Sequence, residues 1–137
     1  KRNVPVQTIM TATLVTVHLG QALSDVRKAM ADGGFHHVPV VSGKKLVGIL
    51  SSTDILRVSY EYQVDPRQVD AILDHNITIE QLMTTGPVKL RNTNTIREAV
   101  DIFAMGKFHS LPVVDADDNL VGLVTTTDVL RYMAEQY

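Results

Sequence analysis

An internal repeat constrains this chain more than any other feature of its sequence. The segments "IMTATLVTV" (9–17), "FHHVPVV" (35–41) and "LVGILSSTDILR" (46–57) recur as "LMTTGPVKL" (82–90), "FHSLPVV" (108–114) and "LVGLVTTTDVLR" (120–131). The offset is 73 positions and becomes 74 after a one-residue insertion in the turn "DADDN". Similarity on this scale is typical of structural units that cannot bury their apolar faces alone. We therefore expect the two copies to pack on each other and to form one core.

Each copy carries the same order of hydrophobic patterns. A short β run near residues 15–17 or 88–90 precedes apolar residues at helical spacing, which are Leu23, Val26 and Met30 or Ile96, Ala99 and Phe103. Two apolar runs with a short polar bridge then predict a hairpin, and a closing helix is expected from Ser52 or Thr126. The sequence thus predicts an α/β (α+β) fold of two tandem β-α-β-β-α units, residues 1–63 and residues 79–137.

The first helix of each copy has a different start. Thr95 and Glu98 fit a capping box in the second copy, whereas the first copy has Ala22 at the equivalent position and keeps only Asp25. The second helix start is therefore the better specified of the two.

The segment between the copies, residues 64–78, is expected to be a partly helical linker. Asp65 is suited to cap a helix, and Pro66 is suited to its first turn. A helix here would limit the freedom of the linker.

Composition and charge narrow the classes of function. At 137 residues and 45% hydrophobic content the chain can bury a core, and its apolar runs are far shorter than the roughly 20 residues that cross a bilayer. The absence of cysteine and of a secretion signal favours a cytoplasmic setting, although a first residue other than Met leaves room for an effector domain outside the chain. A net charge of -2 with intermixed signs argues against nucleic acid as a partner.

Motifs of catalysis are not found in the sequence. It has no Gly-x-Ser-x-Gly elbow, His-Glu-x-x-His, P-loop or Gly-x-Gly-x-x-Gly. Asp54 and Asp128 sit in separate repeats, and nothing marks them as an acid/base pair. We expect that the chain is not an enzyme.

The repeated phrases resemble those of paired cystathionine beta-synthase domains, the CBS-domain pair. The resemblance rests on "HVPVV" and "SLPVV", each followed by Gly-apolar-apolar-Ser/Thr-x-x-Asp, and it extends from about Val6 to Tyr132. It implies two motifs that pack by their sheets about a pseudo-twofold axis, with two clefts that commonly hold adenosine compounds. It also implies assembly as a homodimer.

The phrase Ser/Thr-x-x-Asp has two interpretations. Ser51 with Asp54, and Thr125 with Asp128, fit a capping box ahead of an apolar helix. The same helix starts also favour an anion, and the hydroxyl groups there can donate hydrogen bonds to phosphate; these are on Ser51, Thr53, Thr125 and Thr127. Asp54 and Asp128 are suitable acceptors for ribose hydroxyls, a role that the resemblance also implies.

His36 and His109 follow an identical Phe in the two copies. Each could be a packing residue or a ligand, since imidazole changes charge near neutral pH. In a nucleotide-sensing relative of the CBS family the matching histidine points toward phosphate, which implies a phosphate contact here. The two histidines could also bind a transition metal, but no third ligand of clear spacing accompanies them, so we expect that no metal is required.

Three basic residues remain as partners for phosphate. Arg57 and Arg131 are best interpreted as i,i+3 ion pairs with the preceding aspartates. Lys107 occurs in the second copy only, where the first has Gly34, so the two clefts would differ in affinity if Lys107 reaches the ligand. Adenine would need an apolar slot, for which four residues are candidates although each is also typical of a core: Val15, Val38, Val88 and Leu111.

We therefore expect a regulatory module that binds an adenine nucleotide, with AMP, ADP or ATP ahead of S-adenosylmethionine or NAD. A ligand-free structural dimerisation module and a histidine-based metal sensor are the alternatives. Besides the small adenosine ligand, the expected partners are a second copy and an unseen effector domain or partner protein. Nucleic acid and membrane are not expected.

Overall fold

Two compact units make up the computed structural model, which describes residues 3–12, 14–34, 36–62 and 66–137. One unit consists of Val15–Pro87, and the other of Lys1–Leu14 together with Val88–Tyr137. The units therefore do not follow the repeats. Each contains most of one repeat and a short segment that the alignment assigns to the other.

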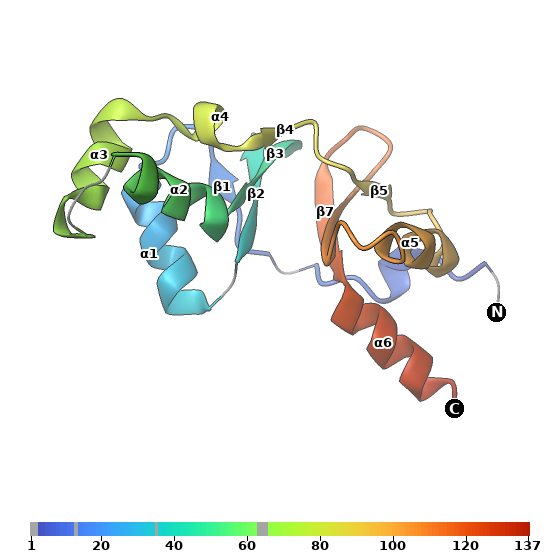
Figure 1. Cartoon of the computed structure of the whole chain (residues 1–137). Helices are drawn as coiled ribbons and strands as arrows, with labels where there is room; N and C mark the ends of the chain where they lie inside the picture. Colours follow the sequence, from blue (N-terminus) through green and yellow to red (C-terminus); the bar gives the residue numbers. More distant parts are fainter. Residues whose placement is uncertain (1–2, 13, 35, 63–65) are drawn as a thin grey trace. The chain divides into compact units, whose positions relative to one another are not determined.

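The unit of residues 15–87 contains the first repeat's sheet and the linker (Figure 1). Its strands lie in the order β1-β2-β3-β4; β2 runs parallel to β1, whereas β3 runs antiparallel to both β2 and β4. The elements are β1 (Val17–His18), α1 (Leu23–Gly33), β2 (His37–Ser42), β3 (Lys45–Ser51), α2 (Ser52–Tyr62), η2 (Pro66–Gln68), α3 (Val69–Asn76), α4 (Ile79–Leu82) and β4 (Thr84–Thr85).

The second unit repeats this plan with a smaller sheet of order β5-β6-β7. Its elements are η1 (Val6–Thr8), β5 (Leu90–Arg91), α5 (Ile96–Phe103), β6 (Ser110–Val114), β7 (Leu120–Thr125) and α6 (Thr126–Glu135). The β-α-β-β-α order predicted for each copy is confirmed, as are the helix starts at Ser52 and Thr126. The first strand of each copy is shorter than expected and begins two residues later.

In each unit a Met-Thr step from one repeat, which is Met10-Thr11 or Met83-Thr84, lies across a strand of the other repeat. Thr11 exchanges two backbone hydrogen bonds with Leu123 of β7, at 2.8 and 2.9 Å. In the other unit β4 pairs antiparallel with Gly48 and Ile49 of β3. These pairings attach the start of each repeat to the end of its partner's hairpin.

Glycine is required where each Met-Thr step crosses. A Cβ atom on Gly48 would lie 2.9 Å from the Thr84 carbonyl oxygen, and one on Gly122 would lie 2.8 Å from Met10 Cγ and 3.1 Å from the Thr11 carbonyl oxygen. A side chain of either strand would therefore push the crossing segment away. This contact explains the glycine that both copies of the repeated phrase keep.

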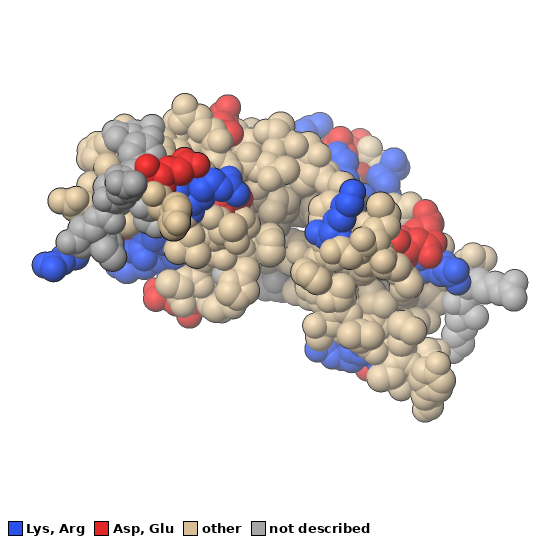
Figure 2. All heavy atoms as spheres, viewed as in Figure 1, with Lys and Arg blue, Asp and Glu red and all other residues tan. Residues whose placement is uncertain are grey.

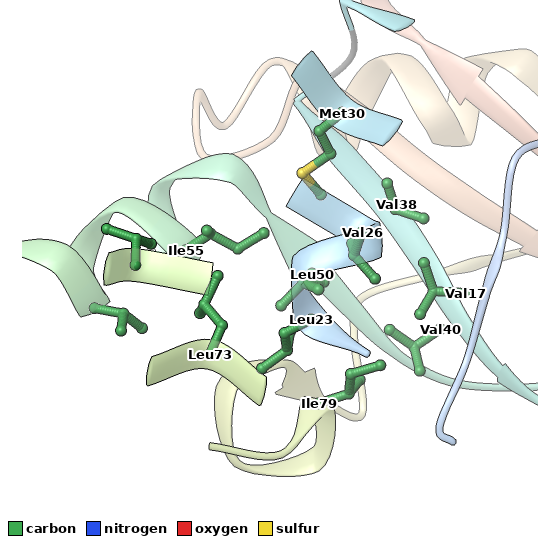
Figure 3. Packing of buried hydrophobic residues seen from close by; sticks show 12 residues of the cluster. Val17, Leu23, Val26, Met30, Val38, Val40, Leu50, Ile55, Leu73 and Ile79 are labelled. Atoms are coloured by element: carbon green, nitrogen blue, oxygen red, sulfur yellow. The ribbon is translucent and has the colours of Figure 1, made fainter. Parts of the chain in front are cut away.

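The buried residues that the structure describes form two clusters, one in each unit. In the unit of residues 15–87 the cluster gathers side chains of β1, β2, β3, α1 and α2 with Leu73 of α3 and Ile79 of α4 (Figure 3). In the other unit Val6 joins side chains of α5, β6 and β7. The segments that each repeat contributes to the unit of the other repeat, called here the exchanged segments, thus complete each core. They supply apolar side chains that the repeat of that sheet lacks.

The linker helix α3 stabilises the poorly capped start of α1. The Ser24 N–H and hydroxyl donate to the Asp74 carboxylate at 3.0 and 2.7 Å, while Ala22 provides no side-chain cap. Arg27 donates two hydrogen bonds to Asp70 at 2.6 and 2.8 Å. The hydrogen bond from Arg27 lowers the pKa of Asp70 below its usual range, and the same bond raises the pKa of Arg27. The linker thus supplies the cap that the first repeat does not encode locally.

Because Met10 crosses Gly122 closely, a methyl group added at Gly122 is predicted to destabilise the fold. Gly122→Ala should lower the free energy of unfolding by about 1–3 kcal/mol, because a backbone carbonyl and a side chain must both move. Chemical denaturation measures this change. Gly20→Ala is the matched control, since no atom lies within 4 Å of a Cβ there; equal costs at the two positions would contradict the crossing.

The ion pair of Arg27 and Asp70 predicts a pH dependence of stability. Because the pKa of Asp70 is lower in the folded protein, its contribution is present above the ordinary Asp pKa of about 3.9 and is lost as pH falls through the lower folded value. Asp70→Asn should cost up to about 1 kcal/mol at pH 7, since both side chains are partly exposed, and progressively less below pH of about 4.

Urea denaturation of the wild-type protein and of the Asp70→Asn variant across this pH range measures the difference in their free energies of unfolding. Asp101→Asn removes an ion pair between two highly exposed side chains and serves as the control, with little expected effect. A cost of Asp70→Asn that stays constant down to pH of about 2 would show that the pair does not act through its charge.

Candidate functional site

The phrase Ser/Thr-x-x-Asp forms a capping box in both repeats. The Asp54 N–H donates to Ser51 Oγ at 3.1 Å, and the Ser51 N–H donates to Asp54 Oδ2 at 2.9 Å. In α6 the same two bonds join Thr125 and Asp128 at 3.0 and 2.9 Å. The capping interpretation is therefore confirmed in both copies.

The capping box uses Oδ2 of each aspartate and leaves Oδ1 available to a ligand. Asp54 Oδ1 lies 3.5 Å from Arg57, and Asp128 Oδ1 lies 3.5 Å from Arg131, which confirms both i,i+3 ion pairs. The aspartate side chains are 14% and 12% exposed, and the arginines are mostly exposed. Since each Oδ1 is held by a solvent-facing arginine at long range, it can still accept a hydrogen bond from a ligand hydroxyl.

The histidine of each repeat is hydrogen-bonded through its backbone to the start of the closing helix of the same repeat. The backbone carbonyl of His36 accepts from the Ser52 N–H at 2.8 Å, and that of His109 accepts from the Thr126 N–H at 2.9 Å. His36 Nδ1 also lies 3.4 Å from Ser52 Oγ. Both histidines are exposed, so each imidazole lies at the surface beside the start of a helix.

The second residue of each helix offers an unused donor. The first N–H of α2 and of α6 is bound by the histidine carbonyl, and the third is bound by the capping hydroxyl. Among the described residues, the N–H groups of Thr53 and Thr127 have no side-chain or loop acceptor. Both threonine side chains are exposed. Each helix start therefore combines one free backbone donor with one accessible hydroxyl, which suits a phosphate.

Sequence reasoning missed the threonines that the other repeat brings to each site. Thr11 pairs with Leu123, two residues before Thr125, and Thr84 pairs with Ile49, two residues before Ser51. Thr11, Thr84 and Thr85 are exposed. The signal that could have found them is the Met-Thr step, which occurs at the same place in both repeats.

The four candidate adenine walls fall into two groups. Val38 and Leu111 are buried in the cores of their own units, so their side chains present no surface to a ligand. Val15 and Val88 are 54% and 45% exposed. Lys107 is exposed in the segment between α5 and β6, and it forms no ion pair with the described residues. Only the two exposed valines are accessible to a base.

Metal and surface-charge features add little to these sites. In the described part of the chain no three His, Asp or Glu side chains gather as a metal site would require. On the face drawn in Figure 2, Lys and Arg side chains are intermixed with Asp and Glu. None of the helices formed by the described residues is long and apolar enough to cross a membrane.

Comparison with known proteins gives a family match over most of the chain. The profile of the CBS domain matches twice, at residues 6–61 and 79–135. Protein MJ0188 of Methanocaldococcus jannaschii is 31% identical over 134 residues, which are 98% of this chain and 46% of that protein. Inosine-5'-monophosphate dehydrogenase of Korarchaeum cryptofilum is 29% identical over 85% of this chain and 21% of its own length. The chain thus spans less than half of these relatives.

Two solved structures are similar over nearly the whole chain. Protein MJ1225 of Methanocaldococcus jannaschii has a TM-score of 0.82 at 26% identity, over 97% of this chain and 49% of the other. CBSX2, a CBS-pair protein of Arabidopsis thaliana, was solved in complex with AMP. It has a TM-score of 0.81 at 26% identity, over 96% of this chain and 97% of its own.

The capping geometry predicts which threonine supports the fold in the absence of ligand. Thr125→Ala should lower the free energy of unfolding by about 1 kcal/mol, because the Asp128 N–H loses its acceptor. Thr125→Ser keeps the hydroxyl and should restore most of this loss, whereas Thr127→Ala should have little effect. Thermal or urea denaturation measures all three, and equal costs for Thr125→Ala and Thr127→Ala would contradict the assigned cap.

Proposed function

Because the chain belongs to the CBS domain family, we propose that it is a regulatory module that binds an adenine nucleotide, AMP, ADP or ATP. The observation that carries this proposal is the pair of matching helix starts, each with a partly free carboxylate, an exposed histidine and an unused N–H. The AMP complex of the similar CBS-pair protein CBSX2 supports the choice of ligand class.

Each group at the helix start has a distinct task in this proposal. Oδ1 of Asp54 or Asp128 accepts hydrogen bonds from the ribose hydroxyls, since Oδ2 is already engaged in the cap. The free N–H and hydroxyl of Thr53 or Thr127 bind phosphate, helped by the positive end of the helix dipole. The capping hydroxyls of Ser51 and Thr125 accept from the backbone and keep their protons for the ligand.

Further phosphate and base contacts complete the proposed site. His36 and His109 lie beside the helix starts, where a protonated imidazole would attract phosphate. Lys107 adds charge in the second copy only, which favours unequal affinity of the two sites and a longer phosphate chain at the second. The exposed Val15 and Val88, with the threonines of the exchanged segments, are the proposed contacts for adenine.

Regulation requires that the ligand binds two arrangements of the protein with different affinity. The chain covers less than half of protein MJ0188 and of inosine-5'-monophosphate dehydrogenase, and the second of these relatives is an enzyme. We infer that a cytoplasmic effector, on the same polypeptide or on a partner protein, carries the activity that this module controls. A homodimer is part of the same proposal and is measured by sedimentation velocity.

A structural role without ligand is the alternative that the observed caps favour. Both aspartates already support helix starts, and a duplicated helix would duplicate its cap. In that case no adenosine compound would bind, and each aspartate would matter only for stability.

Nucleotide binding predicts a thermal stabilisation that depends on the aspartates. AMP, ADP or ATP should stabilise the protein by RT ln(1 + [L]/Kd), which is about 2.7 kcal/mol at 100 times Kd. Asp54→Ala combined with Asp128→Ala should abolish the stabilisation, because both ribose acceptors are lost. A thermal-shift panel that also contains S-adenosylmethionine and NAD identifies the preferred compound.

Separate variants distinguish loss of binding from loss of a cap. Thr53→Ala with Thr127→Ala should leave the melting temperature of the free protein nearly unchanged and weaken nucleotide binding by about tenfold or more, equivalent to about 1.4 kcal/mol. Isothermal titration calorimetry measures the affinity. If no compound of the panel shifts the melt, or if the double aspartate variant keeps the full shift, the proposed site is wrong.

A further inference from the structure

Methionine carries all of the sulfur in this sequence, which has five methionines and no cysteine. Without thiols, the thioethers are the groups that a mild peroxide oxidises, and oxidation converts an apolar side chain into a polar sulfoxide. Met105 and Met133 are 64% and 44% exposed, whereas Met30 is buried in the core of the unit of residues 15–87 (Figure 3). The two remaining methionines, Met10 and Met83, are partly exposed.

Met10 and Met83 both place their sulfur against a glycine of the other repeat. A Cβ atom on Gly122 would lie closer to the Met10 sulfur than to any other nearby atom, and one on Gly48 would lie closest to the Met83 sulfur. Each of these side chains also packs against the buried cluster of its unit. The two thioethers are therefore part of the contacts that attach the exchanged segments.

A sulfoxide would fit this contact poorly. Its oxygen is a hydrogen-bond acceptor, so burying it without a donor costs free energy. Two backbone donors of the crossing at Gly122 are already used, because the N–H groups of Thr11 and Leu123 donate to each other's carbonyl oxygen at 2.8 and 2.9 Å. An oxidised Met10 must leave its oxygen unpaired or turn it toward solvent, and turning removes the sulfur from the glycine.

We propose that Met10 and Met83 form a reversible oxidation switch that releases the exchanged segments. Hydrogen peroxide transfers one oxygen atom to each sulfur, so the sulfur loses two electrons, the O–O bond breaks and water leaves. A thiol-dependent methionine sulfoxide reductase reverses the change, because its thiols reduce the sulfur and the oxygen leaves as water.

The repeat makes this switch act on both units. One methionine lies at each crossing, so the same oxidant weakens both attachments. Thr11 and Thr84 follow these methionines in the chain and pair with the strands that lead to the capped helix starts. Oxidation therefore also displaces a threonine beside each candidate site. The switch itself requires no bound nucleotide.

A peroxide time course on the intact chain tests the switch. Peptide mass spectrometry follows the gain of one oxygen at each methionine, and the melting temperature is measured on the same samples. Met105 and Met133 should be oxidised first with little effect, since both are exposed. Oxidation of Met10 and Met83 should then lower the melting temperature by about 5 °C or more.

Amide hydrogen exchange reports on the crossing at Gly122 directly. The N–H groups of Thr11 and Leu123 should exchange at least about tenfold faster after oxidation, because their two hydrogen bonds open when the segment detaches. Amides within α6 should change little. Equal acceleration throughout the unit would indicate global unfolding and would contradict release of the segment.

Matched variants separate the crossings from general oxidation. Met10→Leu combined with Met83→Leu keeps apolar side chains of similar volume and should keep its melting temperature in peroxide. Met105→Leu combined with Met133→Leu is the control and should lose stability as the wild-type protein does. Treatment of the oxidised wild-type protein with methionine sulfoxide reductase and dithiothreitol should restore its melting temperature.

Four results would overturn the proposal. Met10 and Met83 could stay reduced while Met105 and Met133 are fully oxidised, which mass spectrometry of the wild-type protein decides without any variant. Their oxidation could leave the melting temperature unchanged. The Met10→Leu and Met83→Leu protein could lose as much stability in peroxide as the wild type. Failure of the reductase to restore the fold would show irreversible damage in place of a switch.

Discussion

The crossing of a Met-Thr step over a glycine is the contact on which the arrangement of each unit depends. Met10 and Thr11 cross Gly122, and Met83 with Thr84 crosses Gly48; a Cβ atom would lie 3.1 Å from the Thr11 carbonyl oxygen at Gly122 and 2.9 Å from the Thr84 carbonyl oxygen at Gly48. Through these crossings each repeat gives its first segment to the sheet of the other. The two repeats therefore cannot be separated into two independent domains by a single cut, because each core would lose part of its apolar cover.

The same crossings bring the candidate sites together. β7 ends at Thr125 and β3 ends at Ser51, so the strand that receives the foreign Met-Thr step leads directly into a capped helix start. At that start the fold uses one carboxylate oxygen and two of the first three N–H groups. One carboxylate oxygen, one N–H and one exposed hydroxyl remain available to a ligand. The hydrogen bonds that cap the helix hold these groups in place.

The two units differ in how the start of their first long helix is capped. α3 packs on α1 and α2, where Asp74 replaces the missing cap at Ala22, whereas α5 has its own capping box from Thr95 and Glu98. A locally capped helix start does not need an acceptor from a neighbouring helix. The two repeats therefore stabilise the same helix start by different means, one through the linker and the other within the repeat.

The sequence by itself determined the β-α-β-β-α order, both hairpins, the capping boxes and the family, because periodicity and short-range hydrogen bonds are encoded within a few residues. It also indicated the arginine pairs, which span one helical turn. Only the tertiary structure decided that Val38 and Leu111 are core residues, that Asp74 caps α1 from 50 residues away, and that each repeat lends its Met-Thr step to the other. These outcomes depend on which surfaces meet after the chain turns back, and a local pattern carries no information about such long-range contacts.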